Sequence, residues 1–262
     1  MNDFFEIDFS KPWPFTLFTL TTFLIVFFRY LFISGVYHYV FYKLFQNKFK
    51  KRVINFNPKE VHQYRREIIR SGFTSFIFAV SGTILLILWQ NGYTGIYLGW
   101  TDYPLWYLPI SLLIAMLIHE TYYYWLHRWM HRPKIYQLVH KWHHDSIETT
   151  SFTAFSFHPI ESILQALIIP VIILFLPIHF SVLLVLLVIM TISATINHAG
   201  VEVYPAFFNR HWLGKWIIGA THHDLHHKQF RYNFGLYFTF WDRWMNTESP
   251  KSDEWFEKHT KV

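Results

Sequence analysis

Long apolar stretches, separated by shorter polar ones, dominate the hydrophobic pattern of this chain. Five of them approach the roughly 20 mostly apolar residues that an α-helix needs to cross a bilayer, at positions 15–34, 73–89, 105–125, 159–175 and 178–196. Pro177 separates the last two, which favours a helical hairpin. The pattern therefore predicts an all-α fold, an integral membrane helical bundle of four to five spans.

The composition supports a membrane location. Hydrophobic residues make up 52% of the 262 residues and charged residues only 15%, which is too apolar for an ordinary soluble domain. The chain has no cysteine, which excludes disulfides, thiolate metal sites and cysteine nucleophiles. The first 14 residues carry three acids and one lysine, the wrong sign for a secretory signal, so we interpret the first stretch as an uncleaved anchor.

The positive charge is concentrated in one segment. Residues 43–70 hold nine Lys or Arg against two Glu, a surplus of seven, so the rest of the chain sums to about minus one within the net charge of +6. A basic run between two apolar stretches is typical of a cytoplasmic loop and not of a nucleic-acid-binding surface. With 43–70 in the cytoplasm, the third span delivers 127–144 to the cytoplasm, and the hairpin returns the chain there at about His198.

Three short histidine motifs lie on this same cytoplasmic side. They are "HRWMH" (His127 and His131), "HKWHH" (His140, His143 and His144) and "HDLHH" (His223, His226 and His227). Residues spaced i, i+3 and i+4 share one face of a helix, so each motif can aim several imidazoles at one point. We expect "HRWMH" to continue the third span up to Pro133, "KIYQLVHKWHH" to form a new helix, and "HDLHH" to lie on a helix after Gly219 with Thr221 as its N-cap.

Eight clustered histidines indicate a centre with two metal ions, because one ion takes only four to six ligands. The HExxH motif of zinc proteases is absent, since Thr121, Tyr122 and Tyr123 follow His119 and Glu120. The paired Glu-x-x-His motifs of soluble di-iron bundles are absent too. An all-histidine pair of irons beside a membrane points to oxygen activation.

With these motifs, the sequence resembles the fatty acid hydroxylase / sterol desaturase superfamily of membrane di-iron oxidases over residues 106–247. Within it, "TSFTAFSFHPIESILQ", "ATINHAGVEVYP" and "HHDLHHKQFRYNFGLYFTFWDRW" are similar to sterol C-5 desaturases (lathosterol oxidases). The resemblance implies a 1–104 membrane region that includes the basic loop 43–70, a 105–250 catalytic domain of the fatty acid hydroxylase type that forms a cytoplasmic histidine-rich cap, and a polar 251–262 tail.

The resemblance also implies which residues bind metal. The eight histidines above match the family's iron ligands, and His198 in "NHAG" matches a ninth. Some family members carry a further histidine where this chain has Ala194, so the tenth position is assigned to His222 or to a water held by Asn197. His158, Asp145 and Asp224 are the candidates to orient the ligands, with Glu120 and Glu161 as alternatives. Met245 and Asn246 stand where the family usually has a glycine, which affects a turn.

The implied reaction is the O₂-dependent hydroxylation or desaturation of a membrane lipid, with two iron ions as the cofactor. No dinucleotide-binding glycine fingerprint is present in the chain, so the electrons must come from a separate cytochrome b5-like or ferredoxin-like protein on the cytoplasmic face. A fatty-acid, carotenoid or ether-lipid hydroxylase is the rival enzyme. A histidine-rich metal transporter is the rival of another class, disfavoured because 166–175 and 182–190 lack ionisable residues that would mark a pathway.

Overall fold

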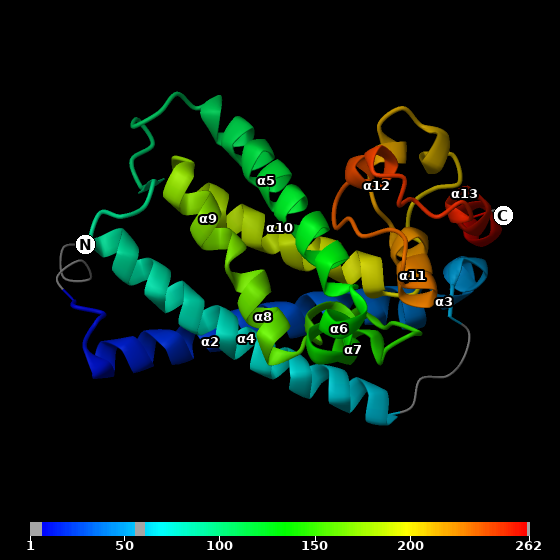
Figure 1. Cartoon of the computed structure of the whole chain (residues 1–262), viewed down its shortest axis with the longest axis horizontal. Coiled ribbons are helices and arrows are strands. Elements are labelled where there is room, and N and C mark those ends of the chain that lie inside the picture. Colours follow the sequence, from blue (N-terminus) through cyan, green and yellow to red (C-terminus); the bar gives the residue numbers. More distant parts are fainter. Residues whose placement is uncertain (1–6, 56–60, 261–262) are drawn as a thin grey trace.

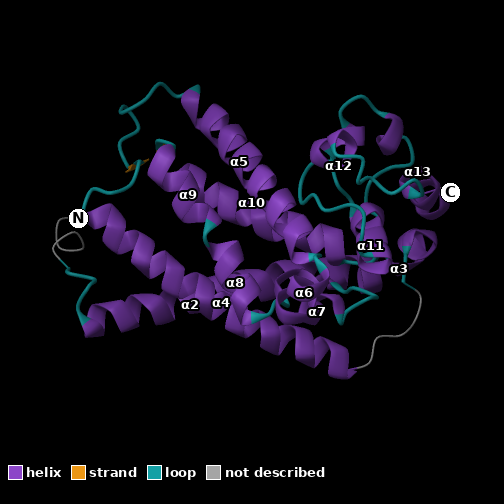
Figure 2. Cartoon of the chain, viewed as in Figure 1, coloured by secondary structure: helices purple, strands orange, loops and turns teal. Residues whose placement is uncertain are grey.

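The structure, a computed structural model, describes residues 7–55 and 61–260. It is an elongated helical bundle with a cap of short helices at one end (Figures 1 and 2). The long helices of the bundle are α2 (Pro12–Tyr39), α4 (Val61–Gln90), α5 (Tyr107–Met130) and α10 (Phe180–His198). The all-α prediction is confirmed, since the only strands in the described ranges are β1 (Ile96–Tyr97) and β2 (Ile178–His179), which pair at the end away from the cap.

Three helices are long and apolar enough to cross a membrane. They are the continuous helix Pro12–Leu44, which is α2 with the π-helical turn η1 (Val40–Leu44), together with α4 and α10. The predicted stretch 159–175 forms two shorter helices, α8 (Pro159–Ala166) and α9 (Ile168–Phe175). Pro170 accounts for this break, because it has no N–H to donate to the carbonyl of Ala166 and its ring crowds that carbonyl.

Apolar packing between α5, α9 and α10 forms the main core at the end away from the cap. Its fully buried residues include Ile168, Ile172, Ile173 and Leu186. The other long pair, α2 and α4, packs side by side along most of its length (Figure 1). The core of α5, α9 and α10 is thus apolar, whereas α2 and α4 bury small polar side chains, including the hydrogen-bonded pair Thr19 and Thr83.

The cap gathers short elements from distant parts of the sequence. The basic segment returns to it, because Val53 pairs with Val201 and Arg52 donates to the carbonyl of Tyr204 at 2.6 Å. The basic segment and the histidine motifs thus lie at the same end, as predicted. The remaining short elements are α3 (Gln46–Phe49), η2 (Lys50–Arg52), α6 (Pro133–Ile135), η3 (Tyr136–His140), α7 (Lys141–His144), η4 (Ser151–Phe155), η5 (Phe208–Arg210), η6 (Gly214–Trp216), α11 (Ala220–Gln229), α12 (Phe240–Trp244) and α13 (Ser252–Thr260).

One sequence expectation about the cap needs correction, and the structure adds detail to the predicted polar tail. The helix α11 begins at Ala220, so Thr221 lies inside it and is not its N-cap. Instead, the buried carboxylate of Glu202 accepts the backbone N–H of Thr221 at 2.9 Å and its hydroxyl at 2.8 Å, where the positive end of the helix favours an acid. The polar tail is also ordered, because 252–260 forms α13, which packs on α11 and buries Phe256.

Candidate metal centre

Nine histidines converge where the cap meets the bundle, and they form two groups. Within each group, one ring nitrogen per residue lies within 4.8 Å of the others. The first group, called site A, has five members and the second, site B, has four. Site A contains His127, His131, His140, His144 and His226, and site B contains His143, His198, His223 and His227.

Helix periodicity explains which histidine joins which site. Residues four apart lie on one face of a helix, so each i, i+4 pair stays within one site. The remaining histidine of each HxxHH motif faces a different direction, and therefore His143 joins site B while His226 joins site A. The two motifs thus each contribute to both sites, and the sites are neighbours, with 4.4 Å between the ring centroids of His144 and His227.

The outward-facing nitrogens of four of these rings are held by oxygen acceptors. Such a contact places the proton on Nδ1 and leaves Nε2 with a free lone pair for a metal. The Nδ1 contacts are His127 to the carbonyl of Phe234 (2.8 Å), His226 to the carbonyl of Tyr232 (2.7 Å), His198 to the carbonyl of Ala194 (2.7 Å) and His140 to the carboxylate of Glu161 (2.8 Å).

The inward-facing Nε2 atoms lie at distances that suit two ligands of one ion. Nε2 of His127 and of His140 are 3.1 Å apart, and those of His198 and His223 are 3.0 Å apart. Because Nδ1 of both His127 and His140 donates outward, their Nε2 lone pairs face each other, and a cation between them removes the repulsion. A metal–nitrogen bond of about 2.1 Å at right angles to a second places the two nitrogens about 3.0 Å apart.

Other ring nitrogens in the two sites are buried without any partner. Nε2 of His131 and both ring nitrogens of His227 have no hydrogen bond within residues 7–55 and 61–260. A buried polar atom without a partner costs about 1–3 kcal/mol, which a bound ion would recover. Burial, reinforced by the neighbouring histidines, lowers the pKa of His144 and of His227 well below the usual range. The rings are therefore neutral, the form that binds transition metals.

One buried carboxylate touches a histidine of these sites directly. Glu161, at the start of α8, accepts Nδ1–H of His140, and the two side chains are 0% and 1% exposed. Glu161 was only an alternative candidate in the sequence. Its signal was the "FHPIE" segment, where Pro159 begins a helix that directs residue 161 inward.

Two further buried carboxylates hold the loop that supplies carbonyl acceptors. Asp242 accepts the N–H groups of Phe234 at 2.8 Å and Gly235 at 2.9 Å, and Glu120 accepts those of Leu236 at 3.1 Å and Tyr237 at 2.7 Å. A Cβ at position 235 would lie 2.9 Å from Glu120 Oε1, so only glycine fits this approach. These hydrogen bonds hold the loop so that its carbonyls at Tyr232 and Phe234 face the histidines of site A. Asp242 was not singled out in the sequence.

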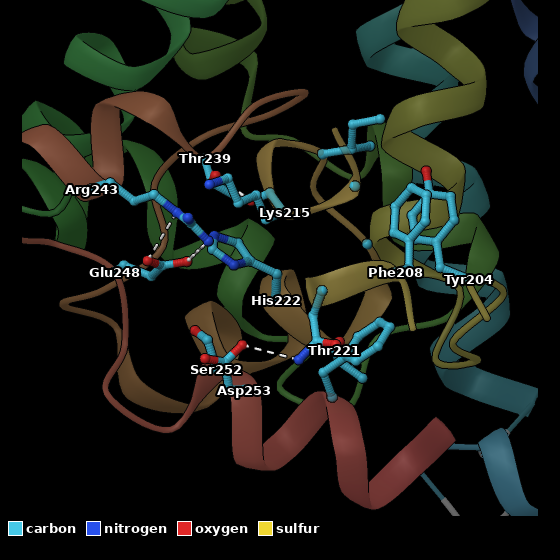
Figure 3. Close-up of a pocket in the computed structure, with 15 residues that line it drawn as sticks. Tyr204, Phe208, Lys215, Thr221, His222, Thr239, Arg243, Glu248, Ser252 and Asp253 are labelled. Carbon is cyan, nitrogen blue, oxygen red and sulfur yellow. Dashed lines mark hydrogen bonds and ion pairs between the residues drawn. The ribbon is translucent and has the colours of Figure 1, made fainter. Parts of the chain in front are cut away.

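His222 does not join either site. It precedes His223 on α11, and its Nε2 lies 3.6 Å from a carboxylate oxygen of Asp242. Figure 3 shows it lining a pocket together with Arg243 and Glu248. The structure therefore does not support the assignment of a tenth ligand to His222.

The acids adjacent to the histidine motifs also point elsewhere. Asp145 pairs with Arg70 at 3.0 Å. Asp224 pairs with Lys228 at 2.8 Å and accepts the indole N–H of Trp255 at 2.9 Å. Both carboxylates are thus held by partners outside sites A and B. These contacts do not support the expectation that Asp145 and Asp224 orient the ligands.

The two remaining candidates have structural contacts. Nδ1 of His158 accepts the N–H of Ile160, which makes His158 the N-cap of α8. Asn197 donates to the carbonyl of Leu236 at 2.8 Å and so supports the same loop as Glu120. Neither contacts a histidine of sites A and B through these bonds.

The C-terminal departure from the family pattern has a backbone explanation. Asn246 has φ of 53°, a left-handed conformation in which glycine is favoured and asparagine is tolerated. Asn246 therefore fits this turn in place of the family's glycine, and the departure affects only the turn, as predicted.

Comparison with known proteins agrees with the histidine arrangement. The family model described as fatty acid hydroxylase matches residues 112–247. The chain is 33% identical to human lathosterol oxidase over 184 residues, which cover 70% of this chain and 60% of the relative. It is 29% identical to a Delta(7)-sterol 5(6)-desaturase of Gibberella zeae over 201 residues, covering 76% of this chain and 61% of the relative.

A third relative is the Delta(7)-sterol 5(6)-desaturase of Candida albicans, 29% identical over 234 residues, with 87% of this chain and 57% of the relative covered. The chain thus spans about three fifths of the length of these three relatives. No solved structure matches the chain.

Proposed function

The chain belongs to the fatty acid hydroxylase family, and we propose that it is a membrane-bound, O₂-dependent di-iron oxidoreductase that acts on a C–H bond of a lipid. The curated relatives named above are sterol 5(6)-desaturases and a lathosterol oxidase, so a sterol-type substrate and desaturation are the first choice. Iron, which imidazole ligands suit, would supply O₂ binding and reduction when bound.

The observation that carries this proposal is the pair of adjacent all-histidine groups. Site A offers five ring nitrogens and site B four, which fits one ion in each with positions left for O₂ or water. We propose the nine histidines of these sites as the metal ligands. Glu161 would keep His140 in the required tautomer, and the loop held by Asp242 and Glu120 would do the same for His127 and His226.

An apolar wall on one side of site B suits a lipid. The ring of Phe157 lies 5.1 Å from that of His143. Phe155, two residues earlier, stacks on Tyr30 of α2 at 5.2 Å in a buried cluster that also contains Ala194 of α10. These side chains connect site B with two helices long enough to span the bilayer, and they would keep water from the reacting carbon.

Desaturation needs two electrons from outside the substrate. The atoms balance when O₂, two protons, two electrons and two substrate hydrogens give two waters and a double bond. We propose that a separate cytochrome b5-like or ferredoxin-like protein delivers these electrons on the cytoplasmic face. The positive charge of the segment that reaches the cap at Arg52 supports this orientation.

The test is lipid analysis of cells with and without the gene, grown with a Delta(7)-sterol, a fatty acid, a carotenoid or an ether lipid. We expect an oxygen-dependent product that has lost two hydrogens from the sterol. A product that has gained one oxygen in another lipid would select the hydroxylase alternative. The variant His143→Ala, produced and inserted normally, should form no product, and purified protein should contain two irons per chain. Unchanged lipids, or less than one iron per chain, would contradict the proposal and favour a transporter.

A further inference from the structure

The segment 131–144, which is helical from Pro133 onward, has two faces of opposite character. Its inner face carries the buried rings of His140, His143 and His144. Its outer face is exposed and consists of Lys134, Leu138, Lys141 and Trp142, where Leu138 is 62% and Trp142 is 39% exposed. No Asp or Glu occurs between positions 121 and 144, so the outer face combines basic with apolar side chains and has no acid of its own segment.

Both ends of the segment lie at the boundary between apolar and charged parts of the bundle. It follows α5, on which Arg128 is the first Lys or Arg. Its far end is bound by Arg70, the last charged residue of α4 before the apolar run 71–90. Arg70 donates to the carbonyl of Trp142 at 2.7 Å, and its guanidinium lies 4.8 Å from the centre of the Trp142 ring. Basic residues at such positions mark the edge of the hydrocarbon layer.

A third contact places the segment at the same depth. The ring of Trp142 lies 4.5 Å from that of His158, the N-cap of α8, from which the chain enters the apolar hairpin. Figure 1 shows α6 and α7 beside the cap-side ends of α4 and α8. The segment therefore runs along this boundary and not away from it.

We propose that the outer face of 131–144 lies in the phosphate headgroup layer of the bilayer, so that this segment is an interfacial helix. Lysines with a tryptophan and a leucine on one helix face are suited to that layer, and each Lys near an anionic surface contributes attraction to lipid phosphates. The inner face would then hold site A and site B within about one helix diameter, roughly 10 Å, of the headgroups. This inference depends on the chain spanning a bilayer and not on the proposed reaction.

The absence of cysteine from the chain allows a direct depth measurement. Leu138→Cys is labelled with an environment-sensitive fluorophore, and the protein is reconstituted into vesicles of phosphatidylcholine and phosphatidylserine. The vesicles carry a lipid nitroxide either near the headgroup or near the chain ends. Two exposed positions serve as controls, Phe28→Cys in the middle of α2 and Glu254→Cys on the outermost helix α13.

We expect the label at position 138 to be quenched by the shallow nitroxide and not by the deep one. The label at 28 should respond to the deep nitroxide, and the label at 254 to neither. Lys134→Gln combined with Lys141→Gln should reduce the shallow quenching at 138 in anionic vesicles. Lys141→Cys provides a second labelling position, and an iron content equal to that of the unmodified protein shows that the fold is kept.

The proposal is overturned if the label at 138 behaves like the label at 254. A second refuting result needs two measurements on the label at 138. The proposal is overturned if lipid nitroxides do not quench this label and a soluble cytochrome b5 haem domain, added to the vesicles, shields the label from iodide. The outer face would then be a docking surface for a protein. Because the readouts that decide the proposal are fluorescence and not lipid oxidation, a failure of the proposed reaction leaves these outcomes interpretable.

Discussion

Replacement of Glu161 tests whether the protein orients the histidines of site A through their outer nitrogens. Glu161→Gln keeps an oxygen that accepts from His140 but removes the charge, whereas Glu161→Ala removes the acceptor. The pair is buried, with 2.8 Å between Nδ1 of His140 and the carboxylate oxygen, so bulk water does not compete for this contact. Loss of such a contact typically costs 10–100-fold in metal affinity, about 1.4–2.7 kcal/mol. We expect roughly tenfold weaker iron binding for Glu161→Gln and roughly 100-fold for Glu161→Ala.

The assay is iron retention during titration with a chelator, measured on purified protein. Glu67→Gln is the matched control, because Glu67 is equally buried and accepts hydrogen bonds from Ser146, Thr150 and Thr153 but from no histidine. This control should lower the unfolding temperature without weakening iron binding. Normal iron retention in Glu161→Ala, or an equal loss in Glu67→Gln, would refute the reasoning.

Three further predictions follow from the cap. Elemental analysis of His222→Ala should find two irons per chain, whereas His227→Ala should lose the ion of site B, because His227 belongs to site B and His222 to neither site. An equal loss of iron in both variants would restore His222 as a ligand. Asp242→Asn should lower the free energy of unfolding by about 1–3 kcal/mol and weaken iron binding, because two loop N–H groups depend on its carboxylate. Asn246→Ala should lower the unfolding temperature by an amount equivalent to about 1 kcal/mol, and Asn246→Gly should not, because the backbone there is left-handed; equal temperatures would contradict this.

The sequence predicted the helical class, most of the long apolar helices and the histidine motifs that come together, because each depends on local periodicity. Apolar runs locate helices, and an i, i+4 histidine pair shares a face wherever the helix goes. The division of nine histidines between two sites did not follow from the spacing, because an i, i+3 pair such as His140 and His143 shares a helix face just as an i, i+4 pair does. The break between α8 and α9 at Pro170 is a local effect as well, but the apolar run concealed it.

The residues that orient the histidines could not be predicted in the same way, because contact there depends on tertiary structure. Nearness in sequence selected Asp145 and Asp224, but adjacency along the chain does not ensure contact, and both acids pair with basic residues instead. Glu161 is 21 positions from His140 in the sequence. Glu120 on α5 and Asp242 on α12 act through the loop 232–238 and not through direct contact with a histidine of either site.

The acceptors of the outer ring nitrogens also show how far the protein prepares the centre before metal binding. They belong to separate parts of the chain, namely α8, α10 and the loop 232–238. Each belongs to an element that has its own packing or hydrogen bonds, as the carboxylates of Glu120 and Asp242 hold the loop. A ring held on its outer side has its tautomer and direction set without a metal, so little reorganisation remains when an ion binds. Five rings have no such acceptor, and their positions should therefore depend most on the ion: His131, His143, His144, His223 and His227.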